Sequence, residues 1–130
     1  MMNYVVWLWV AIGGAAGSLL RHGISILIPA QHGFPWATLS VNLMGCFFLP
    51  FVTEGKWIPP DMQKLFGTGL IGSFTTFSTF SVESMELWGD GNMDGFWVYT
   101  GASLIGGIML SALSFWIIHR YERTFSKGGK

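Results

Sequence analysis

Charged side chains are almost absent from the first 53 residues of the chain. Arg21 is the only Lys, Arg, Asp or Glu before Glu54. A helix needs roughly 20 apolar residues to cross a hydrocarbon core of about 30 Å. The chain offers four such stretches, at about Asn3–Leu20, Trp36–Thr53, Leu65–Val82 and Phe96–Ile118. The pattern predicts an all-α membrane protein with four transmembrane helices.

The composition supports a membrane protein and argues against a soluble globule. Only 11% of the residues are charged and 51% are hydrophobic, whereas about 25% of an average soluble domain is charged. A small soluble domain needs a charged coat because most of its residues lie at the surface. With 130 residues, the chain is expected to form one domain, a single four-span unit over residues 1–130.

Several classes of function are disfavoured by what the sequence lacks. The formal net charge is zero, so no basic field indicates a nucleic-acid partner. Cys46 is the sole cysteine, which excludes an internal disulfide or a cysteine-based zinc site. The three histidines, His22, His32 and His119, follow no metal-ligand spacing. No nucleophile–base pair is recognisable either, so we do not expect an enzyme.

The positive charges are unevenly divided between the loops. With four spans, both termini and the second loop share one side, and the first and third loops share the other. The first side carries all Lys and Arg residues except Arg21, which favours cytoplasmic termini by the positive-inside rule. A cleaved signal peptide is the alternative for the first stretch. It is disfavoured because that stretch has no basic n-region.

The third stretch is unusually polar for a membrane span. More than half of Leu65–Val82 is Gly, Ser or Thr, which suits burial among other helices better than contact with lipid. Gly67, Gly69 and Gly72 lead into a hydroxyl-rich run, where we expect the helix to break. Carbonyls freed at such a break can bind a small cation. The alternative is a helix-packing face whose hydroxyls bond back to their own helix.

Four polar or aromatic positions have both a functional and a structural interpretation. Phe77 and Phe80 are three residues apart and share a helix face. Their positive ring edges could cradle a small anion, but phenylalanines at this spacing also pack as ordinary core residues. Asn42 could line a pore or form an interhelical hydrogen bond, and Glu83 could be an ordinary interfacial carboxylate.

The run from Gly72 to Glu83, Gly-Ser-Phe-Thr-Thr-Phe-Ser-Thr-Phe-Ser-Val-Glu, resembles the third-helix motif of the Fluc (CrcB) family of small bacterial fluoride channels. The similarity extends to Gly13-Gly14 and Arg21 in the first stretch and to residues 36–43 in the second. Tyr99 and Ser103 in the fourth stretch also fit. The resemblance therefore covers nearly the whole chain.

The resemblance implies a dual-topology, antiparallel homodimer that exports fluoride passively through the bacterial cytoplasmic membrane and so lowers its toxicity. It implies a structural Na⁺ that is not transported, held at the broken third helix by the backbone carbonyls of Gly72 and Thr75. Arg21 corresponds to a vestibule arginine. The residues that correspond to the fluoride pathway are Asn42, Phe77, Ser78, Thr79, Phe80, Glu83, Tyr99 and Ser103.

The chain departs from the family pattern at several positions. Ser73-Phe74 replaces the more usual Gly-Leu, and Ala37 stands where Gly is common. Gly107 occupies a position where a serine can continue the polar track of the fourth helix. The uneven Lys and Arg distribution also departs from the near balance expected for dual topology.

Two other classes of membrane protein remain as alternatives. A small multidrug antiporter also has four spans and dual topology, but it needs a membrane-embedded carboxylate for proton coupling. Here the first acidic residue is Glu54, outside the first span. A non-transporting assembly subunit would explain the small residues as packing. It would not explain the Ser and Thr residues concentrated around Phe77 and Phe80.

Overall fold

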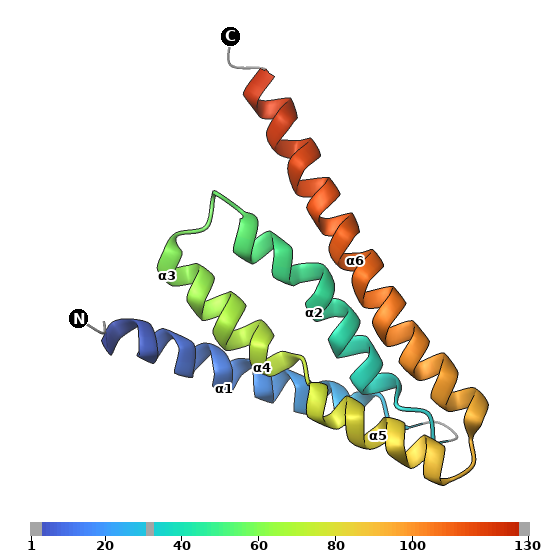
Figure 1. The fold of residues 1–130 in the computed structure, drawn as a ribbon. Coiled ribbons are helices and arrows are strands. Elements are labelled where there is room, and N and C mark those ends of the chain that lie inside the picture. Colours follow the sequence, from blue (N-terminus) through green and yellow to red (C-terminus); the bar gives the residue numbers. More distant parts are fainter. Residues whose placement is uncertain (1–3, 31–32, 128–130) are drawn as a thin grey trace.

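The computed structural model describes residues 4–30 and 33–127, with side chains described as far as residue 123. Every regular element in these ranges is helical. Figure 1 shows α2 and α6 side by side, with α1 crossing obliquely beneath the segment that leads into α4 and α5. In chain order the elements are α1 (Tyr4–Leu27), α2 (Trp36–Glu54), α3 (Pro60–Gln63), the π-helix η1 (Lys64–Ile71), α4 (Gly72–Phe74), α5 (Phe77–Gly89) and α6 (Met93–Lys127).

Three of these helices are long and apolar enough to cross a membrane. They are α1, α2 and the part of α6 from Met93 to Arg123. At 1.5 Å per residue, the 24 residues of α1 extend about 36 Å. Most of their large apolar side chains are exposed, as expected where lipid replaces water around the protein. The prediction of a multi-pass, all-α membrane protein is therefore confirmed.

The third predicted span is not one helix. Its first half is π-helical through Ile71 and continues into the single turn of α4, and α5 begins three residues after α4 ends. π-Helical segments are rare and occur frequently at functional sites. The composite segment runs in the same direction as α1, whereas α2 and α6 return (Figure 1).

Glycines allow α1 to lie directly against η1. A Cβ added at Gly13 would collide with the Leu65 carbonyl oxygen, and one at Gly17 would collide with the Leu70 carbonyl oxygen. A Cβ at Gly69 would lie 2.8 Å from the carbonyl oxygen of Val10. Small residues bring membrane helices close enough for backbone contact. This contact fixes α1 relative to the segment that contains the break.

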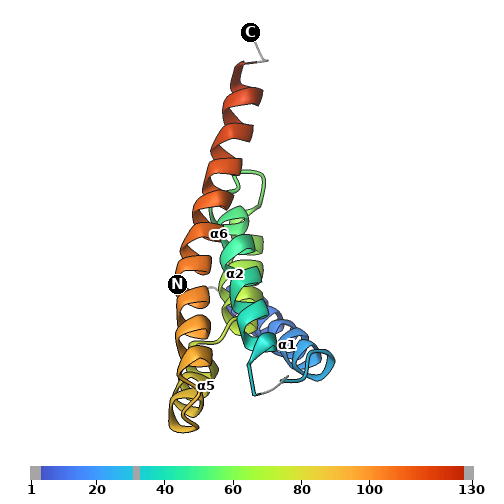
Figure 2. The same cartoon turned by 90° about the vertical axis from the view of Figure 1, so that its right-hand side faces the viewer.

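The second main contact joins α2 to α6 along much of their lengths (Figure 2). Ser111 and Ser114 of α6 donate to the carbonyl oxygens of Cys46 and Phe47, at 3.0 and 2.6 Å. A small core of Leu39, Leu87 and Tyr99 lies where α2, α5 and α6 meet. The core is small because most apolar surface of a membrane protein faces lipid.

Helices α1 and α5 end later in the chain than predicted, so some residues expected in loops lie within helices. α1 extends past the expected end at Leu20, so Arg21 lies within the helix rather than in the first loop. Glu83 lies in the second turn of α5, because that helix continues to Gly89. The predicted start of the first span at Asn3 lies outside the described residues, as does His32 in the first loop.

Candidate functional site

The third segment breaks at Thr75 and Thr76. Both residues have extended backbones, with φ/ψ of −78°/158° at Thr75 and −149°/121° at Thr76. The side-chain amide of Asn42 on α2 bridges this break. Its Nδ2 donates to the Thr76 carbonyl oxygen at 3.0 Å, and its Oδ1 accepts from the Thr76 N–H at 2.8 Å. Asn42 therefore takes over the hydrogen bonds that the helix has lost.

The break frees several carbonyl oxygens, those of Gly72 and Thr75 among them. In a continuous α-helix the N–H of residue i bonds the carbonyl of residue i−4, so Thr76 would bond Gly72 and Thr79 would bond Thr75. The Thr76 N–H instead donates to Asn42, and the Thr79 N–H donates to Thr76 Oγ1 at 3.2 Å. The carbonyls of Gly72 and Thr75 are thus left without their helical donors. These are the two carbonyls for which we predict cation binding.

Threonine hydroxyls organise the start of α5. Thr76 caps the helix by accepting the N–H of Thr79, and its Oγ1 also donates to Thr79 Oγ1 at 3.0 Å. Ser78 Oγ lies 3.3 Å from the same Thr76 hydroxyl. Thr and Ser are favoured N-cap residues because they satisfy N–H groups that the first turn leaves unpaired. The cap places three hydroxyl groups within the first turn of α5.

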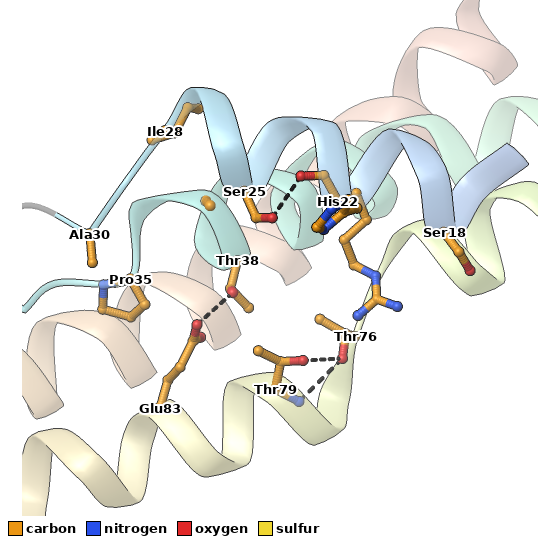
Figure 3. A pocket seen from close by; sticks show the side chains of 12 residues that line it. Ser18, His22, Ser25, Ile28, Ala30, Pro35, Thr38, Thr76, Thr79 and Glu83 are labelled. Carbon is orange, nitrogen blue, oxygen red and sulfur yellow. Dashed lines mark hydrogen bonds between the residues drawn. The ribbon is translucent and has the colours of Figure 1, made fainter.

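A cavity of about 350 Å³ opens beside this turn (Figure 3). The end of α1 forms one wall, and the start of α2 and the first turns of α5 form the others. Arg21 and His22 lie on the α1 side, and Glu83 lies on the α5 side. The remaining lining residues are Ser18, Ser25, Ile28, Ala30, Pro35, Ala37, Thr38, Thr76 and Thr79.

Arg21 lines this cavity with a cationic side chain that is only partly buried. Its Nε is buried and has no hydrogen-bond partner among the described residues. The guanidinium is also permanently charged. This part of the cavity is therefore suited to an anion.

Glu83 is held in place from two sides. Thr38 Oγ1 of α2 donates to Glu83 Oε1 at 2.9 Å, and Tyr99 OH of α6 donates to Glu83 Oε2 at 2.7 Å. Thr38 and Tyr99 are both buried. A carboxylate with this many fixed donors is more constrained than an ordinary interfacial side chain. Glu83 therefore links three helices at the edge of the cavity.

The two phenylalanines differ in their surroundings. Their ring centroids are 5.9 Å apart. The Phe80 ring also contacts that of Tyr99, at 5.2 Å, and packs against the core. Phe77 is 79% exposed, so the described chain does not bury it as a core residue. The packing interpretation explains Phe80 in part and does not explain Phe77.

A second cavity, of about 300 Å³, lies on the opposite side of the break. Thr76 lines both cavities. The second cavity also contains Asn42 and the two predicted cation-binding residues. Its other lining residues are Gly45, Cys46, Leu49, Gly67, Ile71, Phe77 and Ser111.

Four of the predicted pathway residues line neither cavity: Ser78, Phe80, Tyr99 and Ser103. Ser78 lines neither cavity and reaches them only through Thr76. Ser103 Oγ is buried and unpaired among the described residues, one turn beyond Tyr99 on α6. Gly107 packs against Cys46, where an added Cβ would lie 3.2 Å from the sulfur. The glycine that departs from the family pattern thus occupies a tight contact with α2.

The structure brings together most of the predicted residues and adds others. Thr38 and Thr76 were absent from the predicted site, although each contacts a predicted residue. Thr38 precedes Asn42 by four residues on α2, a spacing that places both on one helix face. Ser18, His22 and Ser25 recur at helical spacing on α1, whose remaining residues apart from Arg21 are mostly apolar. This spacing is the signal that could have found them.

Residues 8–115 match the family described as CrcB-like protein, Camphor Resistance (CrcB). A Bacillus cereus protein named fluoride-specific ion channel FluC 1 is 39% identical over 117 residues, which cover 85% of this chain and 81% of that protein. A protein of the same name from Desulfitobacterium hafniense is 40% identical over 112 residues, covering 83% and 98%. The fluoride-specific ion channel FluC of Saccharophagus degradans is 40% identical over 114 residues, covering 84% and 83%. The family match, together with relatives about 40% identical over more than four fifths of their length, shows that the chain belongs to the CrcB-like family.

Proposed function

We propose that this chain forms a fluoride-specific channel that exports fluoride passively from the bacterial cytoplasm. One observation carries the proposal beyond family membership. A cationic arginine and several threonine hydroxyls converge on the cavity at the helix break. Fluoride is small and strongly hydrated, so a pathway must replace its water with close donors. These groups supply such donors.

The proposed route passes from the charged cavity, across Thr76, to the second cavity with Asn42 and Phe77. Thr76 touches both cavities, and its hydroxyl group is linked to Thr79 and Ser78. Asn42 retains a second Nδ2 hydrogen beyond the one donated to Thr76. The ring edges of Phe77 and Phe80 are also weakly positive, so they add to the hydroxyl and amide donors along this route. Glu83, Tyr99 and Ser103 border the route from α5 and α6.

Flux measurements in liposomes test this function against the alternatives. Purified protein is reconstituted, and efflux of fluoride, chloride and a lipophilic cation is measured under the same conditions. A channel of the proposed kind releases fluoride and retains the other two ions. Comparable chloride efflux would overturn the selectivity, proton-coupled cation movement would indicate an antiporter, and no flux at all would indicate an assembly subunit.

We also propose that two chains assemble as an antiparallel, dual-topology homodimer. Four thin helical segments are too few to enclose a polar route, and oligomers of membrane helices commonly form such sites between subunits. The 79% exposure of Phe77, beside an open cavity, supports a missing neighbour. Subunit counting by single-molecule photobleaching should give two subunits, and a C-terminal tag should be accessible from both sides. A single accessible side would contradict dual topology.

A structural Na⁺ at the break is the third part of the proposal. The carbonyls of Gly72 and Thr75 have lost their helical donors, and hard oxygen ligands suit a small cation. Two antiparallel chains would contribute four such oxygens, whose dipoles repel one another unless a positive charge lies between them. Dimer stability and fluoride flux should both fall when sodium is replaced by a large organic cation. Unchanged dimer stability and fluoride flux after exhaustive sodium removal would contradict the proposed structural Na⁺.

A further inference from the structure

We infer that His22 is a second cationic group of the anion cavity, so that protonation of its imidazole increases fluoride entry. This inference rests on the proposed fluoride conduction. His22 lies next to Arg21 on α1 and lines the same cavity (Figure 3). Neither the spacing of the histidines nor any metal cluster among the described residues gives it a metal-binding role.

The position of His22 on α1 follows from helical periodicity. Ser18, His22 and Ser25 recur at intervals of four and three residues, so they share one face, and all three line the cavity. The neighbouring Leu19, Leu20 and Ile26 are exposed apolar residues, as expected on a lipid-facing surface. The last turns of α1 therefore present one polar face, which is directed at the cavity.

The imidazole of His22 is exposed at that cavity and is not held by a partner among the described residues. Ser25 Oγ donates to the backbone carbonyl of His22, not to its ring. The ring has no hydrogen-bond or ion-pair partner among the described residues, and the residue is exposed rather than buried. Histidine is the side chain whose charge ordinarily changes between about pH 5 and 8.

The charges that face His22 determine how its protonation changes the net charge of the cavity. Arg21 on α1 and Glu83 on α5 are the other ionisable groups that line the cavity, and the described lining residues from α2 and the preceding loop are uncharged. Arg21 and Glu83 carry opposite charges, so the cavity is close to neutral when His22 is neutral. Protonated His22 makes it net positive, and a positive cleft raises the local concentration of anions.

The experiment records fluoride current in planar bilayers while the pH is lowered on both sides together. Current is the appropriate readout because neutral HF crosses a bilayer without carrying charge. At roughly 10 mM sodium fluoride, where the Debye length is about 30 Å, we expect about a two- to threefold increase between pH 8 and pH 5.5. At about 1 M salt, screening should remove most of the increase.

Two variants and one control assign the pH response. His22→Gln should carry the wild-type current of pH 8 at every pH, and His22→Lys should carry the higher current even at pH 8. His119→Gln is the matched control, because His119 lies near the far end of α6 and does not line the cavity. It should keep the wild-type profile.

Each outcome decides the inference. A rise that persists in His22→Gln would assign the response to another group, such as Glu83, and overturn the inference. A flat profile in the wild type would overturn it as well, while leaving fluoride conduction intact. Absence of fluoride current at every pH would instead refute the proposed function, and the inference with it.

Discussion

The two cavities beside the helix break differ in the charge of their lining residues and in how far the described chain encloses them. The cavity beside α1 contains Arg21, His22 and Glu83, whereas the described residues lining the other cavity are all uncharged. Glu83 in the first cavity is fixed by donors from two other helices. The second cavity ends at Phe77, most of which is exposed.

This difference indicates separate tasks for the two sides of the break. One chain alone builds the cavity with ionisable residues, where we propose that fluoride enters. In the proposed dimer, surface from the partner chain would complete the uncharged cavity, which contains the freed carbonyls and the exposed phenylalanine. Thr76 and Asn42 connect the two, so substitutions there and on either side should have unequal effects.

Asn42→Asp should have the largest effect on fluoride efflux, because it changes a residue that lies between the two cavities. A charge in the middle of a membrane span costs about 2.5–3.5 kcal/mol, and the new carboxylate would face both the Thr76 carbonyl and the passing anion. We expect fluoride efflux to fall by about 100-fold. Efflux is measured from liposomes that contain equal amounts of folded protein.

Asn92→Asp is the matched control for this charge change. Asn92 lies in the loop between α5 and α6, where its Oδ1 accepts the Gly95 N–H at 3.0 Å. An aspartate there keeps this acceptor and should leave efflux unchanged. Wild-type efflux in correctly folded Asn42→Asp protein would show that Asn42 does not border the pathway.

Gly17→Val should destabilise the charged cavity more than the uncharged one. A Cβ at residue 17 would collide with the Leu70 carbonyl oxygen and lie 3.0 Å from the Phe74 backbone nitrogen. Overpacking of this kind costs about 1–3 kcal/mol or more, and here it would push away the helix that carries Arg21. The unfolding temperature in detergent should fall by several degrees.

Gly23→Val provides the comparison on the same helix, because no atom beyond the adjacent residues and the nearby backbone of α1 itself lies within 4 Å of its Cβ position. This variant should retain the wild-type unfolding temperature. Equal stability of the two variants would mean that the close approach of α1 to η1 contributes little to the fold.

Phe80→Ile tests the role of the aromatic ring edges near the helix break. Isoleucine keeps apolar bulk but removes the ring contacts with Phe77 and Tyr99, which lie at centroid distances of 5.9 and 5.2 Å. Aromatic pairs contribute about 0.5–1.5 kcal/mol beyond burial, so we expect roughly a tenfold loss of fluoride efflux. Phe115→Ile, at a partly exposed α6 position, is the control. If both variants conduct equally, the ring of Phe80 has only a packing role.

Thr38→Val should have the smallest effect of the four. Valine matches the shape of threonine but cannot donate to Glu83, whose other oxygen would still accept from Tyr99. A typical hydrogen bond contributes about 0.5–1.5 kcal/mol net, which corresponds to roughly a two- to tenfold change in efflux. Thr53→Val removes only a bond of 3.2 Å within α2 and should be silent. Identical effects of the two valines would exclude a specific role for the Thr38–Glu83 bond.

Much of the architecture could be predicted because a bilayer leaves few choices to the backbone. Spans without charge must form helices that satisfy their own hydrogen bonds, and α1, α2 and α6 follow directly from that requirement. The Gly, Ser and Thr content of Leu65–Val82 likewise predicted a weakened helix. Helix ends were predicted less well, since polar residues such as Arg21 can remain helical when they line a cavity.

The tertiary structure alone decided how the polar residues are paired. The sequence predicted that Asn42, Glu83 and Tyr99 are polar groups inside apolar helices, which need partners. It could not show that Asn42 bridges Thr76, or that Thr38 and Tyr99 share Glu83, because these bonds join residues up to 45 positions apart. Hydropathy and spacing describe one helix at a time. The cavity emerges only when the close contact of α1 and η1 brings three helices to the same break.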